Sequence, residues 1–199
     1  MYVRTQSFGS SDEELRFLQR NGVRHKGVVF PFHSGVGWKQ DELEQIRERH
    51  ETFGITLDMS SIPIYEQLPN IIYHGKSPER DREIDLVCDM IRTASRAGID
   101  SLRYNTCILP IDRTEPEEGR GGFMHTAFRL DKIPQEEQET LTGAGRVTAE
   151  MHWERIEYLL ERMIPVAEEY NVRVGNSQED PPTPPGYKGV DKVLNDFEA

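Results

Sequence analysis

The sequence lacks the features that mark several large classes of protein. It contains no run of about 18 consecutive apolar residues, so no transmembrane helix is expected. The first residues contain no apolar stretch long enough for a signal peptide. There is no long Lys/Arg run, and the net charge is −11, which disfavours nucleic-acid binding because that function normally needs a basic patch. These absences predict a cytoplasmic protein that binds neither membrane nor nucleic acid.

Cysteine is scarce, and the common nucleotide-binding motifs are missing. The two cysteines, Cys88 and Cys107, form no C-x-x-C pair, so we expect buried free thiols rather than a zinc knuckle or a redox motif. No G-x-G-x-x-G and no Walker A motif follows any expected strand, which weakens a nucleotide-binding function.

What the chain does contain is an alternation of short apolar runs and helical periods. The patterns predict strands at 1–6, 26–30, 55–59, 101–105 and 172–174, and helices at 11–19, 41–53, 78–97 and 148–170. Pro165 lies inside the last helical pattern and predicts a bend. We expect one domain over 1–199, with a long polar loop insertion at 110–147 after the fourth strand.

Strands that alternate with helices predict an α/β fold with a parallel sheet and right-handed crossovers. Two architectures compete, an open doubly wound sheet and a (β/α)8 barrel. A complete barrel needs roughly 250 residues. The sequence therefore predicts, in the barrel case, a partial (β/α)8 TIM-type barrel of about five parallel strands with outer helices.

Several segments of the chain form a recognisable combination of motifs. The most specific are Pro-Val-Ala-Glu-Glu at 165–169 with Asp-Pro-Pro at 180–182 and Gly-Tyr-Lys-Gly-Val-Asp at 186–191. Further segments are Gly-Ile-Thr-Leu-Asp at 54–58, Tyr104-Asn105, Arg-Thr-Glu-Pro at 113–116 and Gly-Arg-Gly-Gly at 119–122. Together these segments resemble the mannonate dehydratase family, within the TIM-barrel group of sugar isomerases and epimerases. The resemblance covers essentially the whole chain but only the N-terminal part of the family's length.

The resemblance implies dehydration of D-mannonate to 2-dehydro-3-deoxy-D-gluconate with Mn²⁺ or Fe²⁺ as cofactor. The metal would orient the sugar acid and polarise its oxygens while a base removes the proton next to the carboxylate. The family's other metal ligands and its acid/base groups are expected on later strands, beyond residue 199, so activity of this chain alone is doubtful.

One departure from the family pattern concerns the metal. Ser177 stands where the family carries a metal-binding His, and a neutral hydroxyl is a poor ligand for Mn²⁺ or Fe²⁺. Glu179 is a second candidate for donating oxygen to a metal, but we first expect it to be a solvated loop carboxylate. Asp180 matches the pattern, and we expect it to shape the loop.

Four residues are candidates for binding the substrate. Tyr104 and Asn105 end the fourth expected strand, and the Asn105 side chain is expected to hydrogen-bond a substrate hydroxyl or else to cap its own loop. Arg113 is a candidate partner for the substrate carboxylate, or a solvated loop cation. His33 follows the second strand in a Gly-rich loop and either lines a pocket or serves the structure.

Three functions stay open at this stage. The first is a mannonate dehydratase-like, metal-dependent lyase acting on a small sugar acid. The second is another sugar isomerase or epimerase of the same barrel group. The third is a catalytically inactive remnant or sugar-acid-binding module, which Ser177 favours. An incomplete barrel also predicts self-association or low stability through its exposed sheet edge.

Overall fold

The computed structural model describes residues 4–6 and 9–194. Its main sheet has five strands, all parallel, in the order β1-β2-β3-β4-β7. The strands are β1 (Arg4–Thr5), β2 (His25–Val28), β3 (Thr56–Ser61), β4 (Ser101–Asn105) and β7 (Arg173–Ser177). The predicted first strand starts at residue 1, and residues 1–3 lie outside the described part.

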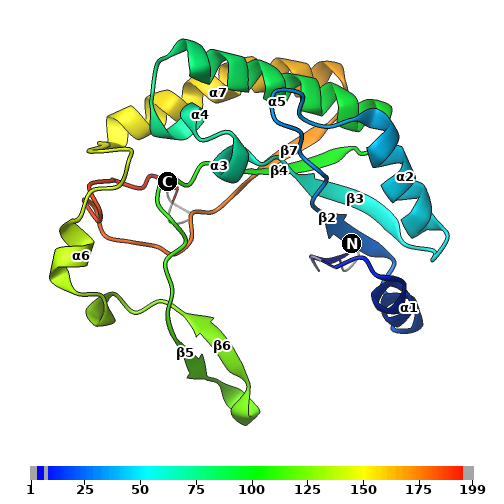
Figure 1. Ribbon diagram of the computed structural model, residues 1–199, viewed down its shortest axis with the longest axis horizontal. Coiled ribbons are helices and arrows are strands. Elements are labelled where there is room, and N and C mark those ends of the chain that lie inside the picture. The colour runs from blue at the N-terminus through cyan, green and yellow to red at the C-terminus, as the bar shows by residue number, and fades with distance from the viewer. Residues whose placement is uncertain (1–3, 7–8, 195–199) are drawn as a thin grey trace.

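The strands follow one another across the sheet in chain order, as they do in a (β/α)8 barrel. Figure 1 shows the sheet curving beneath the long helices, which lie along its outer side. No helix packs along the concave side in the part of the chain that the structure describes (Figure 1). The fold is therefore α/β, a partial TIM-type barrel of five parallel strands with outer helices.

The four long helices are α1 (Asp12–Arg20), α2 (Gln40–Glu51), α5 (Pro78–Arg96) and α7 (Ala149–Glu169). Side chains cap three of them, because Ser11, Ser77 and Thr148 each accept a hydrogen bond from a backbone N–H three residues later. Helix α7 continues through Pro165 to Glu169. Two short helices, α3 (Ile64–Gln67) and α4 (Asn70–Tyr73), follow β3.

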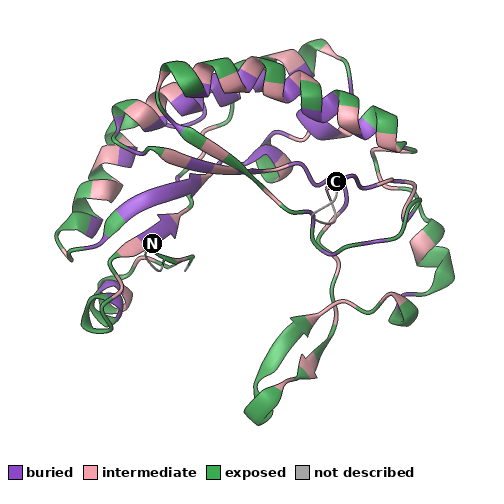
Figure 2. Ribbon diagram, turned by 180° about the vertical axis from the view of Figure 1, so that it is seen from behind, coloured by how far each residue is buried: buried purple, intermediate pink, exposed green. Residues whose placement is uncertain are grey.

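The hydrophobic core lies between the sheet and the outer helices. Leu57, Leu102 and Tyr104 of the strands pack with apolar residues of α5 and α7. Figure 2 shows these buried positions along the sides of α5 and α7 that face the sheet. Both cysteines are buried free thiols, as the sequence predicts. Among the described residues, no helix has the length and apolar character to span a bilayer.

Residues 110–147, between β4 and α7, contain regular structure of their own. An antiparallel hairpin of β5 (Thr114–Glu118) and β6 (Met124–Ala127) projects from the body of the molecule (Figure 1). The 3-10 helices η1 (Arg120–Gly122) and η2 (Leu130–Lys132) and the short helix α6 (Gln135–Glu139) complete the segment. Gly121 and Gly122 adopt φ of 75° and 79° at the hairpin turn, a conformation that favours glycine.

Candidate functional site at the strand ends

The carboxyl ends of β4 and β7 lie side by side, and they bring together two of the predicted site residues. Asn105 is the register partner of Ser177, and both are the last residues of their strands. Paired residues of parallel strands point to the same face of a sheet. The Asn105 and Ser177 side chains therefore project together from the face opposite the helices.

Tyr104 belongs to the other face of the sheet. Its side chain is buried in the core against the helices, and burial raises the pKa of its phenol. Successive residues of a strand alternate between faces, so Tyr104 points away from Asn105. The structure therefore separates these two predicted substrate-binding residues.

The Asn105 side chain shapes the loop that follows β4. Its Oδ1 accepts a hydrogen bond of 2.7 Å from the backbone N–H of Cys107, which is the local capping arrangement considered from the sequence. The side-chain Nδ2 donates to none of the described residues. The amide therefore keeps two donor hydrogens for a hydroxyl placed over the strand ends.

Arg103 lies on the same face of the sheet, and its side chain reaches toward β3 and β1. Its Nε and Nη2 donate to Ser61 Oγ at 3.2 and 3.0 Å, and its Nη1 donates to Gln6 Oε1 at 3.3 Å. Ser61 ends β3, and Gln6 directly follows β1. The guanidinium therefore lies across the ends of three strands. Sequence reasoning missed Arg103, although its alternation with buried Leu102 and Tyr104 already indicates the inner face.

Arg113 lies in the loop before the hairpin and is paired with Asp180, in the Asp-Pro-Pro loop at 180–182. Its Nη2 contacts Asp180 Oδ2 at 2.5 Å, and its Nη1 lies 3.5 Å from Asp180 Oδ1. The pair borders a hollow of about 570 Å³ between the base of the hairpin and the Asp-Pro-Pro loop. The Arg113 charge is thus compensated within the chain, and Asp180 links the loop after β7 to the loop before the hairpin.

Glu179 is buried, which corrects the sequence expectation of a solvated loop carboxylate. Its side chain is fully covered, and Oε1 lies 3.2 Å from Nε2 of the equally buried His152. Burial raises the pKa of Glu179 to about 7, and the nearby Lys192 opposes that shift. Burial lowers the pKa of His152, whose Nδ1 faces the Asp191 carbonyl at 3.0 Å. Neither Glu179 carboxyl oxygen has a hydrogen-bond partner among the described residues, since His152 Nε2 also faces the Thr106 carbonyl at 3.2 Å.

His33 is held by α2. Its Nε2 lies 2.7 Å from Glu42 Oε2, and this hydrogen bond is the main cause that lowers the pKa of Glu42. The flanking Phe32, Ser34 and Gly35 line a hollow of about 440 Å³ beside α5.

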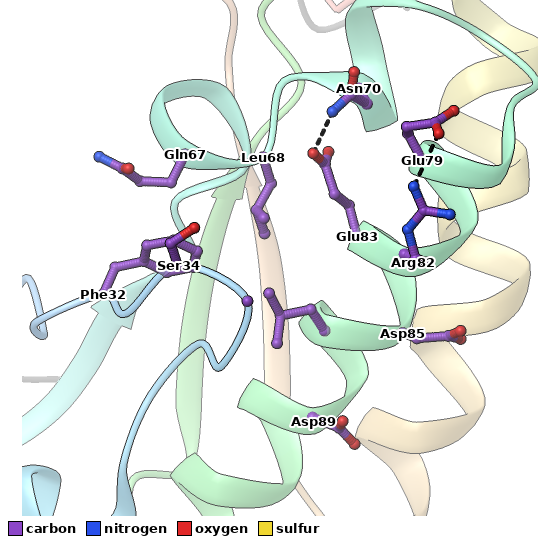
Figure 3. A pocket seen from close by; sticks show the side chains of 12 residues that line it. Phe32, Ser34, Gln67, Leu68, Asn70, Glu79, Arg82, Glu83, Asp85 and Asp89 are labelled. Atoms are coloured by element: carbon purple, nitrogen blue, oxygen red, sulfur yellow. Dashed lines mark hydrogen bonds and ion pairs between the residues drawn. The ribbon is translucent and has the colours of Figure 1, made fainter.

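This second hollow is acidic. Figure 3 shows Glu79, Glu83, Asp85 and Asp89 of α5 along it, with Arg82 as the cation among them. Arg82 pairs with Glu79 at 2.9 Å, and Glu83 accepts a hydrogen bond from Asn70. An excess of carboxylates repels an anionic ligand. The hollow beside His33 is therefore a poor site for a sugar acid.

The described residues contain no group of three or more His, Cys, Asp or Glu side chains arranged to hold a metal ion. Ser177 offers only a neutral hydroxyl, and Glu179 is buried against His152. What the strand ends do offer is an amide, two hydroxyls and a guanidinium. That set suits hydrogen bonding to a polyhydroxylated anion.

Comparisons with known proteins find similarity to mannonate dehydratases. A family model described as D-mannonate dehydratase matches residues 127–199. The mannonate dehydratase of Shouchella clausii is 24% identical in an alignment that covers 79% of this chain and 52% of that protein. Mannonate dehydratase 2 of Halalkalibacterium halodurans is 26% identical over 88% of this chain and 57% of its own length.

The fold comparison agrees with the sequence comparisons. The crystal structure of mannonate dehydratase from Streptococcus suis serotype 2 superposes with a TM-score of 0.79 at 19% identity. The match covers 100% of this chain and 57% of that one, so the chain spans about half the length of the relatives that it matches. The resemblance seen in the sequence is thereby confirmed, in that the chain is similar to mannonate dehydratases in sequence and in fold.

Proposed function

We propose that this chain binds a small sugar acid at the carboxyl ends of β4 and β7 and that it is mannonate dehydratase-like. The reaction would be dehydration of D-mannonate to 2-dehydro-3-deoxy-D-gluconate, by loss of the proton next to the carboxylate and of a neighbouring hydroxyl. The observation that carries the proposal is the pairing of Asn105 with Ser177 on the open face, in a chain related to mannonate dehydratases.

The roles of the chain's own residues follow from their contacts. The Asn105 amide donates to a substrate hydroxyl while its oxygen holds the Cys107 N–H. The Ser177 hydroxyl, on the neighbouring strand, donates to or accepts from a second substrate hydroxyl. Arg113 stays a candidate for the carboxylate, and binding there requires the substrate to compete with Asp180.

Mn²⁺ or Fe²⁺ is the cofactor that the resemblance implies, and when bound it would polarise substrate oxygens. The described residues do not fit such a site, because Ser177 replaces an imidazole and no three suitable ligands lie together. The same observation favours a second candidate function, a sugar-acid-binding protein without turnover.

One experiment separates these functions. Purified protein is incubated with D-mannonate and Mn²⁺, 2-keto acid formation is measured, and D-mannonate binding is measured by calorimetry. Turnover supports the lyase, whereas saturable binding without product supports the binding protein. Absence of both overturns the proposal, and product from ketoses instead of hexonates points to an isomerase or epimerase.

Asn105→Asp tests the role of the amide within that site. Asp keeps the oxygen that accepts from the Cys107 N–H but removes the Nδ2 donor and adds a charge that repels an anion. We expect D-mannonate affinity to fall by about tenfold or more, with thermal stability retained. The matched control is Asn176→Asp, because Asn176 is exposed and pairs with Tyr104 rather than with Asn105. Equal losses in the two variants contradict the assignment.

A further inference from the structure

The face of the sheet opposite the helices carries the guanidinium of Arg103, whose contacts within the described part of the chain include no carboxylate. The contacts of Arg103 among the described residues are the neutral oxygens of Ser61 and Gln6. Arg113, in contrast, is paired with Asp180, and Arg173 lies 3.3 Å from Asp100. Arg103 therefore keeps its full charge for an anion.

The surrounding structure holds Arg103 in place on one side. Two of its hydrogen bonds converge on Ser61 Oγ, so β3 fixes the orientation of the guanidinium plane. The acid of that strand, Asp58, is already engaged by Arg4 at 3.4 Å and by His25 at 3.1 Å. An anion arriving at Arg103 thus meets a positioned donor group, and the acid of β3 is already paired with other cations.

The other side of Arg103 is open. Its register partner on β7 is Gly175, and a Cβ built at Gly175 would meet nothing within 4 Å. A small hollow of about 30 Å³ borders Arg103, Ser61, Gln6 and Met59, which is room for a group the size of one water molecule or carboxylate oxygen. Asn105 and Ser177 lie two residues further along the same two strands.

We propose that Arg103 binds the carboxylate of the sugar acid, while Asn105 and Ser177 bind its hydroxyls. This inference rests on the proposed function and assigns the carboxylate to Arg103 instead of Arg113. A guanidinium suits the role because its planar fork of N–H donors matches the two oxygens of a carboxylate. This assignment fixes the orientation of the bound sugar acid, with its carboxylate toward β3 and its hydroxyls toward the ends of β4 and β7.

Calorimetric titration of the full chain with D-mannonate and with D-mannitol tests the assignment, since mannitol carries a hydroxymethyl group in place of the carboxylate. For Arg103→Gln we expect D-mannonate to bind about 10- to 100-fold more weakly, and mannitol binding to stay unchanged. Arg103→Lys is expected to recover part of the loss, because it restores the charge but not the fork.

The matched control is Arg173→Gln, which removes an arginine two positions earlier along the neighbouring strand. It is expected to leave D-mannonate affinity within about twofold. Unchanged D-mannonate affinity in Arg103→Gln, or a larger loss in Arg113→Gln, overturns the inference and leaves the proposed function standing. Failure of the unsubstituted chain to bind D-mannonate overturns the proposed function itself. Thermal unfolding of each variant establishes that a loss of affinity is not a loss of fold.

Discussion

Glu179 is ionised with difficulty because it is buried beside His152. Burial raises its pKa from 4.5 to about 7. The folded state therefore holds this proton over a pH range in which the unfolded chain releases it. The stabilising contribution is complete below pH 4.5 and is lost as the pH rises through 7, and it amounts to about 3 kcal/mol. The lowered pKa of His152 acts in the opposite sense on the acid side.

Glu179→Gln isolates the carboxyl contribution, since the amide has nearly the same shape and does not titrate. We expect the unfolding free energy of the unsubstituted chain, relative to that of the variant, to fall by about 3 kcal/mol between pH 5 and pH 8. Urea unfolding at four pH values in this range measures the difference. A difference that is constant with pH rules out the raised pKa as its source.

Among single residues, the sequence predicted those at strand ends better than those in loops. Asn105 and Ser177 were found because motifs place them at strand ends, and parallel pairing brings such ends together. Glu179 was expected in solvent, because its neighbour His152 lies 27 positions earlier on a helix and no local pattern links the two. Arg103 escaped notice for the same reason, since Ser61 is 42 positions away.

Helices α5 and α7 are joined by a buried charge as well as by apolar packing. Arg80 is fully buried, its guanidinium lies 4.0 Å from the ring centre of Tyr158, and its Nη1 lies 3.1 Å from Glu154 Oε2. Glu154 is about half exposed, and Arg155 beside it is also buried. Removing Glu154 therefore leaves a buried charge, whereas removing Arg80 leaves a carboxylate that water can reach.

Glu154→Ala leaves the buried Arg80 charge without its carboxylate, and we expect a loss of about 3 kcal/mol in unfolding free energy. Arg80→Met leaves Glu154 free to hydrate and fills the space with apolar atoms, so a loss of about 1 kcal/mol is expected, largely from the cation–π contact. Chemical denaturation gives both values. Glu161→Ala, at an exposed position of the same helix, serves as the control. A larger loss in Arg80→Met than in Glu154→Ala contradicts this account.

The elements with strong periodicity were predicted within one to three residues at most ends. The β4 range 101–105 matches completely, and the predicted start of α5 at residue 78 is correct. The β5–β6 hairpin was missed because its first strand reads Thr-Glu-Pro-Glu-Glu, without apolar alternation, and contains a proline. The four-residue helices α3 and α4 are too short to show a helical period.

The main sheet of the molecule has two edge strands, β1 and β7. Within residues 4–6 and 9–194, β1 pairs only with β2, and β7 pairs only with β4. The backbone groups along the outer edge of a parallel strand can pair with a strand of another chain. Three of the five β7 residues, Arg173, Gly175 and Asn176, are exposed, which leaves this strand accessible.

We propose that the chain self-associates through the β7 edge, and we expect the average mass in sedimentation velocity to rise with protein concentration. Asn176→Lys puts a charge on that edge, a device by which natural sheets avoid edge pairing, and should return the protein toward monomer. Gln135→Lys, an equal change of charge at an exposed position of α6, should leave association as it was. Mass that is independent of concentration, or an equal response of both variants, shows that the β7 edge is not the contact. Asn105 and Ser177 end β4 and β7, so a partner strand on this edge would lie directly beside the proposed binding site. Repeating the sedimentation series with D-mannonate present shows whether association and ligand binding are coupled.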